Sequence, residues 1–170
     1  MTAFRRLSHG GRIDRNIPVV AQYDGKPLAG FAGDTLASAL LANNKIIVAR
    51  SFKYHRPRGV FSAGVEEPNA LFTMGENARS EPNIPATMTD FVEGLVARSQ
   101  NAWPSPDFDL MAMNSVLSPL FQSGFYYKTF MGPTKGAWMF YEHFIRRAAG
   151  LGKATASADP GRFQGSCRIN

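Results

Sequence analysis

The side chains with the greatest capacity for chemistry lie in one basic and aromatic run, residues 51–64. Its candidate contact residues are Lys53, Tyr54, His55, Arg56 and Arg58. Cationic side chains interleaved with aromatic rings can bind phosphate groups or nucleic acid, or can line a cofactor. The competing interpretation is a solvated loop whose arginines cap carbonyl groups and pair with glutamates. Because the run is short and isolated, its composition favours the solvated loop and ranks nucleic acid last.

Catalytic and metal-binding arrangements are not visible in the linear order of residues. His55 would need a partner and a pocket to act as a general base, so a structural hydrogen bond is its expected role. The adjacent Glu66 and Glu67 are expected to form salt bridges with arginines of the basic run rather than an acidic dyad. The single cysteine, Cys167, can form no internal disulfide, and no Cys/His cluster has zinc spacing.

Bulk composition is that of a globular protein. The chain has 170 residues, of which 44% are hydrophobic and 19% charged, which predicts one compact domain or one domain with a helical extension. A net charge of +6 is compatible with nucleic-acid, membrane-surface or acidic-protein partners, but the excess is too modest to select one. No apolar run has the length of a signal sequence or a membrane span, so we expect a cytoplasmic protein without membrane association.

The elements that must position the basic run come before it. Two short apolar segments, residues 18–23 and 26–31, flank Asp24-Gly25 and predict a β-hairpin, because Asp and Gly tolerate the positive φ of a type I′ turn. Asp34 is expected to cap a helix over residues 35–42, and Asn43-Asn44 to end it. Residues 45–49 are β-branched and predict a strand. The order hairpin, helix, strand is that of a β-grasp domain, the architecture of ubiquitin-like proteins and plant-type ferredoxins.

The remainder divides into a loop-rich part and a helical part. Residues 50–89 are rich in Gly and Pro, with a strand expected at 69–74, a turn after Gly75 and a closing strand at 87–92. Beyond a connector at 101–106, helices are expected at 107–120 and 136–149, with an aromatic run at 121–130 between them. We therefore predict an α+β chain: a β-grasp, plant-type ferredoxin-like domain over residues 1–98, a helical extension over 99–152, and a linker or tail over 153–170.

Several separated motifs resemble one known family. They are residues 11–15, 33–43, 53–59 with 62–64 and 66–71, 125–131 and 145–152. In this order they resemble the N-terminal segment of the alpha subunit of heterotetrameric sarcosine oxidases, from about residue 4 to residue 163. The family continues into a dinucleotide-binding domain, so the resemblance implies a truncation before that domain and a free thiol without a role at Cys167.

The wider family includes small [2Fe–2S] subunits of amine, opine and cyanide-forming dehydrogenases, which carry the same basic loop and then a Cys-x4-Cys-x2-Cys pattern. Laid on this chain, that pattern falls at Ser62, Glu67 and Ala70, with the fourth ligand near Thr87. None is a cysteine, and side chains of Ser, Glu, Ala and Thr cannot replace four thiolates. The scaffold is therefore expected to survive without the cluster.

The resemblance also implies a function. The complete complex oxidatively demethylates sarcosine to glycine, forming hydrogen peroxide and formaldehyde or methylenetetrahydrofolate, with FAD, FMN, NAD and tetrahydrofolate bound outside this segment. Its partners are the remaining alpha domains and the beta, gamma and delta subunits. This segment is expected to be a structural docking module with no catalytic, cofactor-binding or metal-binding residue. The alternatives are a [2Fe–2S] electron-transfer subunit of an amine or opine dehydrogenase, disfavoured by the missing cysteines, and a basic nucleic-acid-binding module.

Overall fold

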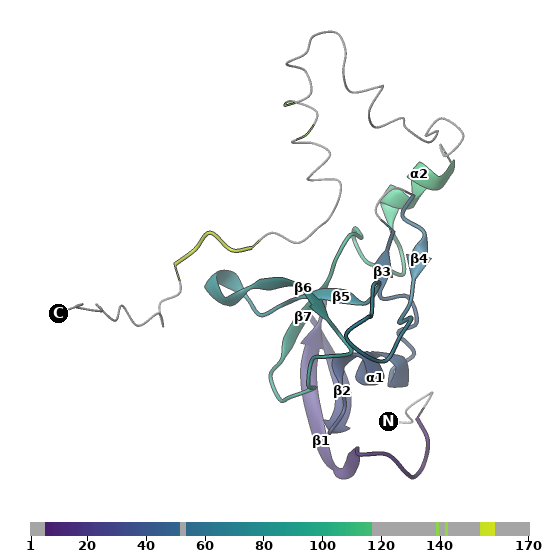
Figure 1. The fold of residues 1–170 in the computed structure, drawn as a ribbon, viewed down its shortest axis with the longest axis vertical. Helices are drawn as coiled ribbons and strands as arrows, with labels where there is room; N and C mark the ends of the chain where they lie inside the picture. Colours follow the sequence, from purple (N-terminus) through teal and green to yellow (C-terminus); the bar gives the residue numbers. More distant parts are fainter. Residues whose placement is uncertain (1–5, 52–53, 117–138, 140–141, 143–153, 159–170) are drawn as a thin grey trace, which may run out of the picture.

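A five-stranded mixed sheet is the centre of the structure (Figure 1), a computed structural model that describes residues 6–51, 54–116, 139, 142 and 154–158. The strand order across the sheet is β2-β1-β7-β5-β6. The strands are β1 (Asp14–Tyr23), β2 (Lys26–Ala32), β5 (Leu71–Met74), β6 (Glu81–Pro85) and β7 (Val96–Ser99). Helix α1 (Leu36–Ala42) packs against this sheet, so the predicted α+β, β-grasp architecture is confirmed.

The first hairpin forms where its local sequence predicts it. Strands β1 and β2 pair antiparallel, with Tyr23 opposite Lys26 across the turn. The turn residues Asp24 and Gly25 have φ of 49° and 73°, the left-handed values that a type I′ turn requires. The turn therefore matches the right-handed twist of the strands and fixes their register.

Helix α1 begins one residue later than predicted. Its N-cap is Thr35 in a capping box, in which the Thr35 hydroxyl accepts from the Ser38 amide and the Ser38 hydroxyl accepts from the Thr35 amide. The prediction that Asp34 caps this helix is therefore wrong. The helix ends as expected, because Asn43 is its C-cap and Asn44 follows with a φ of 59°.

Asp34 is instead a buried acceptor that ties the N-terminal segment to the hairpin and the helix. Its carboxylate receives two guanidinium hydrogen bonds from Arg6, at 2.8 and 2.7 Å. The Phe31 amide and the Ser38 hydroxyl donate to it as well, at 2.9 and 2.6 Å. Asp34 therefore satisfies the donors that meet where three segments converge.

The closing strand lies further along the chain than predicted. It is β7, which pairs parallel with β1 and antiparallel with β5, so the prediction of a strand at 87–92 is wrong. That stretch runs past the start of α1, where the Leu36 amide donates to the Thr89 carbonyl and the Phe91 amide to the Asp34 carbonyl. Phe91 is buried, but it enters the core from a loop.

Two further strands differ from expectation. Strand β6 pairs antiparallel with β5 at the edge of the sheet, although its region was expected to be loop. Its two prolines are tolerated because an edge strand need not donate on both sides. The predicted strand at 45–49 is reduced to β3 (Ala49–Arg50), which pairs with β4 (Pro57–Arg58) in a separate two-stranded sheet. Within the predicted strand Val48 is buried, while Ile46 remains exposed.

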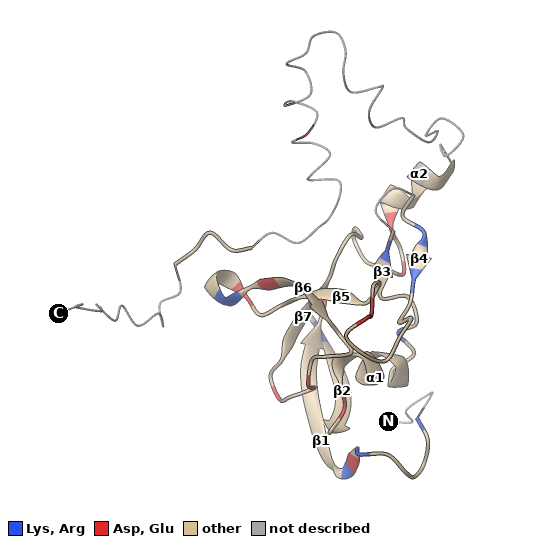
Figure 2. Cartoon of the chain, in the orientation of Figure 1, with Lys and Arg blue, Asp and Glu red and all other residues tan. Residues whose placement is uncertain are grey.

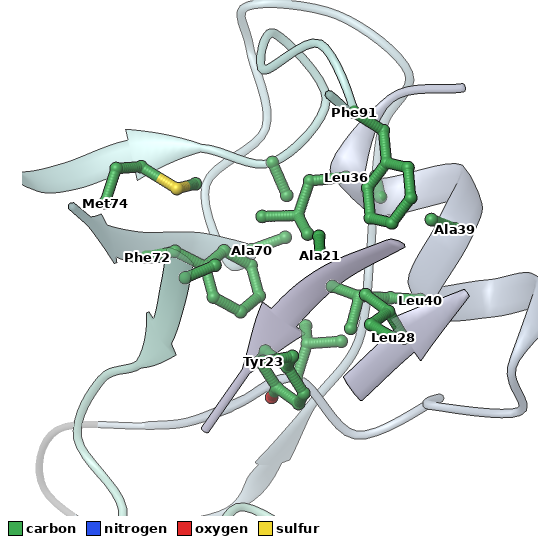
Figure 3. Close-up of a cluster of buried hydrophobic side chains, with 14 of the residues drawn as sticks. Ala21, Tyr23, Leu28, Leu36, Ala39, Leu40, Ala70, Phe72, Met74 and Phe91 are labelled. Carbon is green, nitrogen blue, oxygen red and sulfur yellow. The ribbon is translucent and has the colours of Figure 1, made fainter. Parts of the chain in front are cut away.

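The hydrophobic core lies between the sheet and α1 (Figure 3). Leu36 and Leu40 enter it from the helix and Phe72 from β5, all three fully buried. The rings of Phe72 and Tyr23 meet edge to face, with centroids 5.8 Å apart. This core is assembled from apolar side chains of the hairpin, the helix, β5 and β7.

The segment after β7 is described as far as Val116. It contains the 3₁₀ turn η2 (Leu110–Ala112) and the single-turn helix α2 (Met113–Val116), which lie within the predicted helix 107–120. The rest of that prediction and the aromatic run 121–130 lie outside the described residues, as does nearly all of the predicted helix 136–149. Among the described residues, no helix has both the length and the apolar character needed to span a bilayer.

We expect Phe72→Ala to lower the free energy of unfolding by about 3–5 kcal/mol, because it leaves a cavity in a packed core. Phe61→Ala is the matched control, since the Phe61 side chain is 79% exposed. That variant is expected to change stability by no more than about 0.5 kcal/mol. Urea unfolding of the 170-residue chain measures both, and equal losses would contradict the core as described.

Candidate functional site

The segment on which the resemblance places three of the family's four cluster ligands folds into a tight loop around a carboxylate. We call residues 61–70 the cluster loop. The Glu67 carboxylate lies at its centre and is only 3% exposed. Its Oε2 accepts hydrogen bonds from the amides of Phe61 at 2.7 Å and Ser62 at 2.6 Å. Its Oε1 accepts from the amides of Asn69 at 2.7 Å and Ala70 at 3.0 Å.

These hydrogen bonds decide the ionisation of Glu67. Burial opposes the charged form and by itself would raise the pKa of the carboxyl. The amides of Ser62, Asn69, Ala70 and Phe61 outweigh burial, and they hold the pKa of Glu67 below its ordinary value of 4.5. The expectation that Glu67 pairs with an arginine is therefore wrong: its partners in the structure are four backbone amides and the Ser62 hydroxyl, which donates to Oε2 at 3.4 Å.

The four residues at which we expect the family's ligand pattern lie in or beside this loop. Ser62 and Ala70 donate their amides to the carboxylate of Glu67, which occupies the second position. Thr87 lies beside them, since its hydroxyl donates to the Gly64 carbonyl at 2.8 Å. Ala70 and Thr87 are buried, and Ser62 is half-buried.

The side chains at these positions do not fit an iron–sulfur cluster. A [2Fe–2S] cluster requires thiolates, or imidazoles at two of the positions in Rieske-type sites. Here the positions offer two hydroxyls, a carboxylate already engaged by four amides, and a methyl group. Within the part of the chain that the structure describes, no three His, Cys, Asp or Glu side chains gather as a metal-binding group.

The basic run packs against the segment that follows β7. Arg50 donates through Nε to the Pro106 carbonyl at 2.8 Å and through Nη1 to the His55 carbonyl at 3.0 Å. Lys45 and Asp107 form an exposed ion pair at 3.0 Å. Arg50 directly precedes the basic run and caps two carbonyl groups, as the solvated-loop interpretation expects of the arginines within the run.

His55 is buried and forms a hydrogen bond with Asp109, 54 residues away. His55 Nδ1 lies 2.6 Å from Asp109 Oδ2, and both side chains are almost completely buried. The other oxygen, Oδ1, accepts from the amides of Trp103 and Met111, each at 3.1 Å. His55 thus makes the structural hydrogen bond expected of it, whereas sequence reasoning missed Asp109 because nothing local marks it as a partner.

The remaining residues of the candidate interaction loop have different environments. Arg56 and Arg58 are exposed, and Figure 2 shows the basic residues that line β3 and β4. Tyr54 is half-buried, with the Arg56 guanidinium 4.9 Å from its ring centroid. Lys53 lies outside the described residues. His55 faces inward, so among the described residues of the candidate interaction loop the exposed surface comes from the two arginines and part of Tyr54.

Comparison with known proteins identifies the family. A family model described as a 2Fe-2S iron-sulfur cluster binding domain matches residues 17–102, half of the 170-residue chain. The chain belongs to this family. Its residues 17–102 are thus a 2Fe-2S-type domain.

Curated relatives are much longer than this chain. A sarcosine oxidase subunit alpha of Rhizobium meliloti (strain 1021) is 57% identical over 161 residues, which cover 95% of this chain and 16% of that protein. A sarcosine oxidase subunit alpha of Corynebacterium sp. (strain U-96) is 46% identical over 91 residues, or 52% of this chain and 9% of that protein. One solved structure, L-proline dehydrogenase from P. horikoshii, is 28% identical with a TM-score of 0.41, covering 51% of this chain and 16% of that one.

The bond between His55 and Asp109 makes a testable prediction. Asp109→Ala removes one partner of a buried pair and leaves two amides without an acceptor, so we expect a loss of about 3 kcal/mol in the free energy of unfolding. Asp107→Ala is the matched control, because the Lys45–Asp107 ion pair is exposed and contributes at most about 1 kcal/mol. Urea unfolding of both variants measures the two losses of stability. Equal losses for Asp109→Ala and Asp107→Ala would argue against a structural role for the buried pair.

Glu67 predicts a characteristic dependence of stability on pH. Because its pKa is depressed in the folded state, its contribution is present above the ordinary value of 4.5 and is lost as pH falls through the folded pKa. We expect Glu67→Gln to be less stable than the natural chain near neutral pH, and the difference to shrink in acid, where a protonated carboxyl resembles the amide. Urea midpoints from about pH 7 to pH 3 measure this difference. A difference independent of pH would contradict an ionised Glu67.

Proposed function

We propose that this chain is a structural docking module of the alpha subunit of a sarcosine oxidase complex. The observation that carries the proposal is the 57% identity, across 95% of the chain, to the Rhizobium meliloti protein of that name. In such a complex sarcosine is oxidatively demethylated to glycine, with hydrogen peroxide and formaldehyde or methylenetetrahydrofolate as products. FAD, FMN, NAD and tetrahydrofolate bind outside this segment, which performs no catalysis alone.

The two side chains best suited to acid–base chemistry, Glu67 and His55, are occupied by hydrogen bonds inside the fold, which supports a non-catalytic role. The Glu67 carboxylate is saturated by four amides, and His55 is held by Asp109. The electron-transfer alternative needs thiolates that the four aligned positions do not supply. In the described part of the basic run, the exposed cations are Arg56 and Arg58, which is a small charge for binding nucleic acid.

The surface best suited to docking is formed by the basic loop and the segment after β7. We call Arg56, Arg58, Trp103, Phe108 and Met113 the docking face. Trp103, Phe108 and Met113 are 64%, 65% and 69% exposed. The basic loop and the segment after β7 are joined by the His55–Asp109 hydrogen bond, so these exposed apolar side chains and cations lie on neighbouring segments. Exposed apolar side chains near arginines are typical of a surface that a partner covers.

The proposed occupant of the docking face is the rest of the alpha subunit. The 161 matched residues make up 16% of the Rhizobium meliloti protein, so most of such a subunit lies outside this segment. Helix α2, which carries Met113 of the docking face, lies beside β3 and β4 (Figure 1). In this proposal residues 1–98 form the β-grasp domain, 99–152 a helical extension that joins the contact, and 153–170 a linker. The beta, gamma and delta subunits complete the assembly.

Co-expression tests the docking face. The 170-residue chain, carrying a tag, is expressed with the beta, gamma and delta subunits of the Rhizobium meliloti complex and an alpha subunit lacking the matched segment. We expect co-purification, and we expect Trp103→Ser/Phe108→Ser to weaken association by roughly tenfold or more, since buried aromatics dominate interface energies.

The control is Val20→Ser/Val92→Ser, which alters exposed apolar side chains on β1 and on the stretch before β7. This variant is expected to associate normally. Failure of the folded natural chain to associate would overturn the proposed function. Association of the Trp103/Phe108 variant at full strength would overturn the docking face while leaving subunit membership intact.

A further inference from the structure

We propose that the cluster loop is an anion-binding nest that the chain fills with its own Glu67 carboxylate, in the place where members of this family hold an iron–sulfur cluster. A nest is a concavity in which successive backbone N–H groups point at one negative centre, and such nests bind phosphates and iron–sulfur clusters. The loop would thus keep the shape of a cluster site with an internal anion as its occupant.

The convergence of the amides is the first argument. Four backbone N–H groups, at 2.6 to 3.0 Å, donate to the two oxygens of one carboxylate, two to each oxygen. An ionised carboxylate has about four lone-pair sites, so its accepting capacity is filled. Buried amides without an acceptor would destabilise the loop, so this backbone conformation requires an acceptor at its centre. Four N–H groups that converge on one point favour an anion in that place.

The sequence positions of the donors are the second argument. A local turn would explain the hydrogen bonds that Glu67 accepts from the amides of Asn69 and Ala70, which lie two and three residues after it in the sequence. It does not explain the bonds from Phe61 and Ser62, which lie six and five residues behind and close the loop around the carboxylate.

The overlap with the ligand pattern is the third argument. Glu67 itself lies at the second position of the Cys-x4-Cys-x2-Cys pattern, and its donors Ser62 and Ala70 lie at the first and third. Thr87, near the fourth, is bonded to Gly64 within the same loop. A cluster held by four thiolates is an anion that accepts hydrogen bonds through its sulfurs, so one carboxylate can satisfy the same donors.

Removal of the side chain tests the nest. Glu67→Ala leaves a space that matches acetate, whose methyl and carboxylate groups correspond to the atoms removed. In the 170-residue chain we expect a fall in Tm of roughly 5–10 °C, which sodium acetate partly and saturably reverses while sodium chloride at equal ionic strength does not. Glu66→Ala is the matched control, because Glu66 is exposed, and acetate should leave its Tm unchanged.

A cysteine graft tests the correspondence with the cluster. We expect the variant Ser62→Cys/Glu67→Cys/Ala70→Cys/Thr87→Cys, supplied with ferrous iron and sulfide under reducing conditions, to bind iron and absorb visible light. The triple variant that retains Glu67 should bind none, because the carboxylate keeps its place among the amides.

Several results would overturn the proposal: acetate leaving the Tm of Glu67→Ala unchanged, acetate stabilising the natural chain equally, or the triple variant binding a cluster. Should the Glu67 variants fail to fold, amide hydrogen exchange on the natural chain decides. The amides of Phe61, Ser62, Asn69 and Ala70 should then be protected together and to a similar degree. Rapid or unrelated exchange of these four amides would contradict a shared acceptor.

Discussion

Three buried carboxylates, those of Asp34, Glu67 and Asp109, hold together the parts of the chain that the main sheet does not pair. Asp34 and Asp109 bind donors distant in the sequence: Asp34 fixes the N-terminal segment, and Asp109 joins the basic loop to the segment after β7. Glu67 binds amides within six residues of it and closes the cluster loop. A buried carboxylate is stable only when hydrogen bonds replace its hydration, so each of these groups requires one arrangement of its neighbours. The irregular parts of the molecule thereby acquire a defined shape without regular secondary structure.

The fold does not depend on a metal centre for its core. Phe72, Leu36 and Leu40 pack between the sheet and α1, and the apolar cluster that they form is assembled from the hairpin, helix and strands. Burial of this apolar surface supplies the main stabilisation of the domain. A member of the 2Fe-2S family can therefore lose its thiolates and keep its architecture, provided that the donors of the cluster loop find another acceptor.

The sequence predicted the turns and helix ends that depend on the backbone preferences of a few neighbouring residues. It did not predict the strand pairings and buried side-chain partners that depend on contacts between distant segments. The Asp24-Gly25 hairpin and the helix stop at Asn43-Asn44 follow from backbone preferences of those residues. Strand β7 was missed because Ala97 is its one buried residue, so its sequence shows no clear alternation of apolar and polar residues. Strand β6 was missed because its two prolines are typical of a loop. The expected ligand positions come from the resemblance and stay a prediction. Sequence reasoning did not predict the role of Glu67, because four backbone amides converge on its carboxylate only after the loop has folded.

The parallel pairing of β1 with β7 has a consequence for how this domain forms during synthesis. Strand β1 is made before its parallel neighbour β7, which ends at Ser99 and emerges only after some 75 further residues. During that interval the β1–β2 hairpin exposes an unpaired edge and an apolar face, and a pairing so distant in sequence closes slowly. The nascent chain therefore passes through a stage in which a hydrophobic sheet edge is unpaired, and completion of β7 ends that stage.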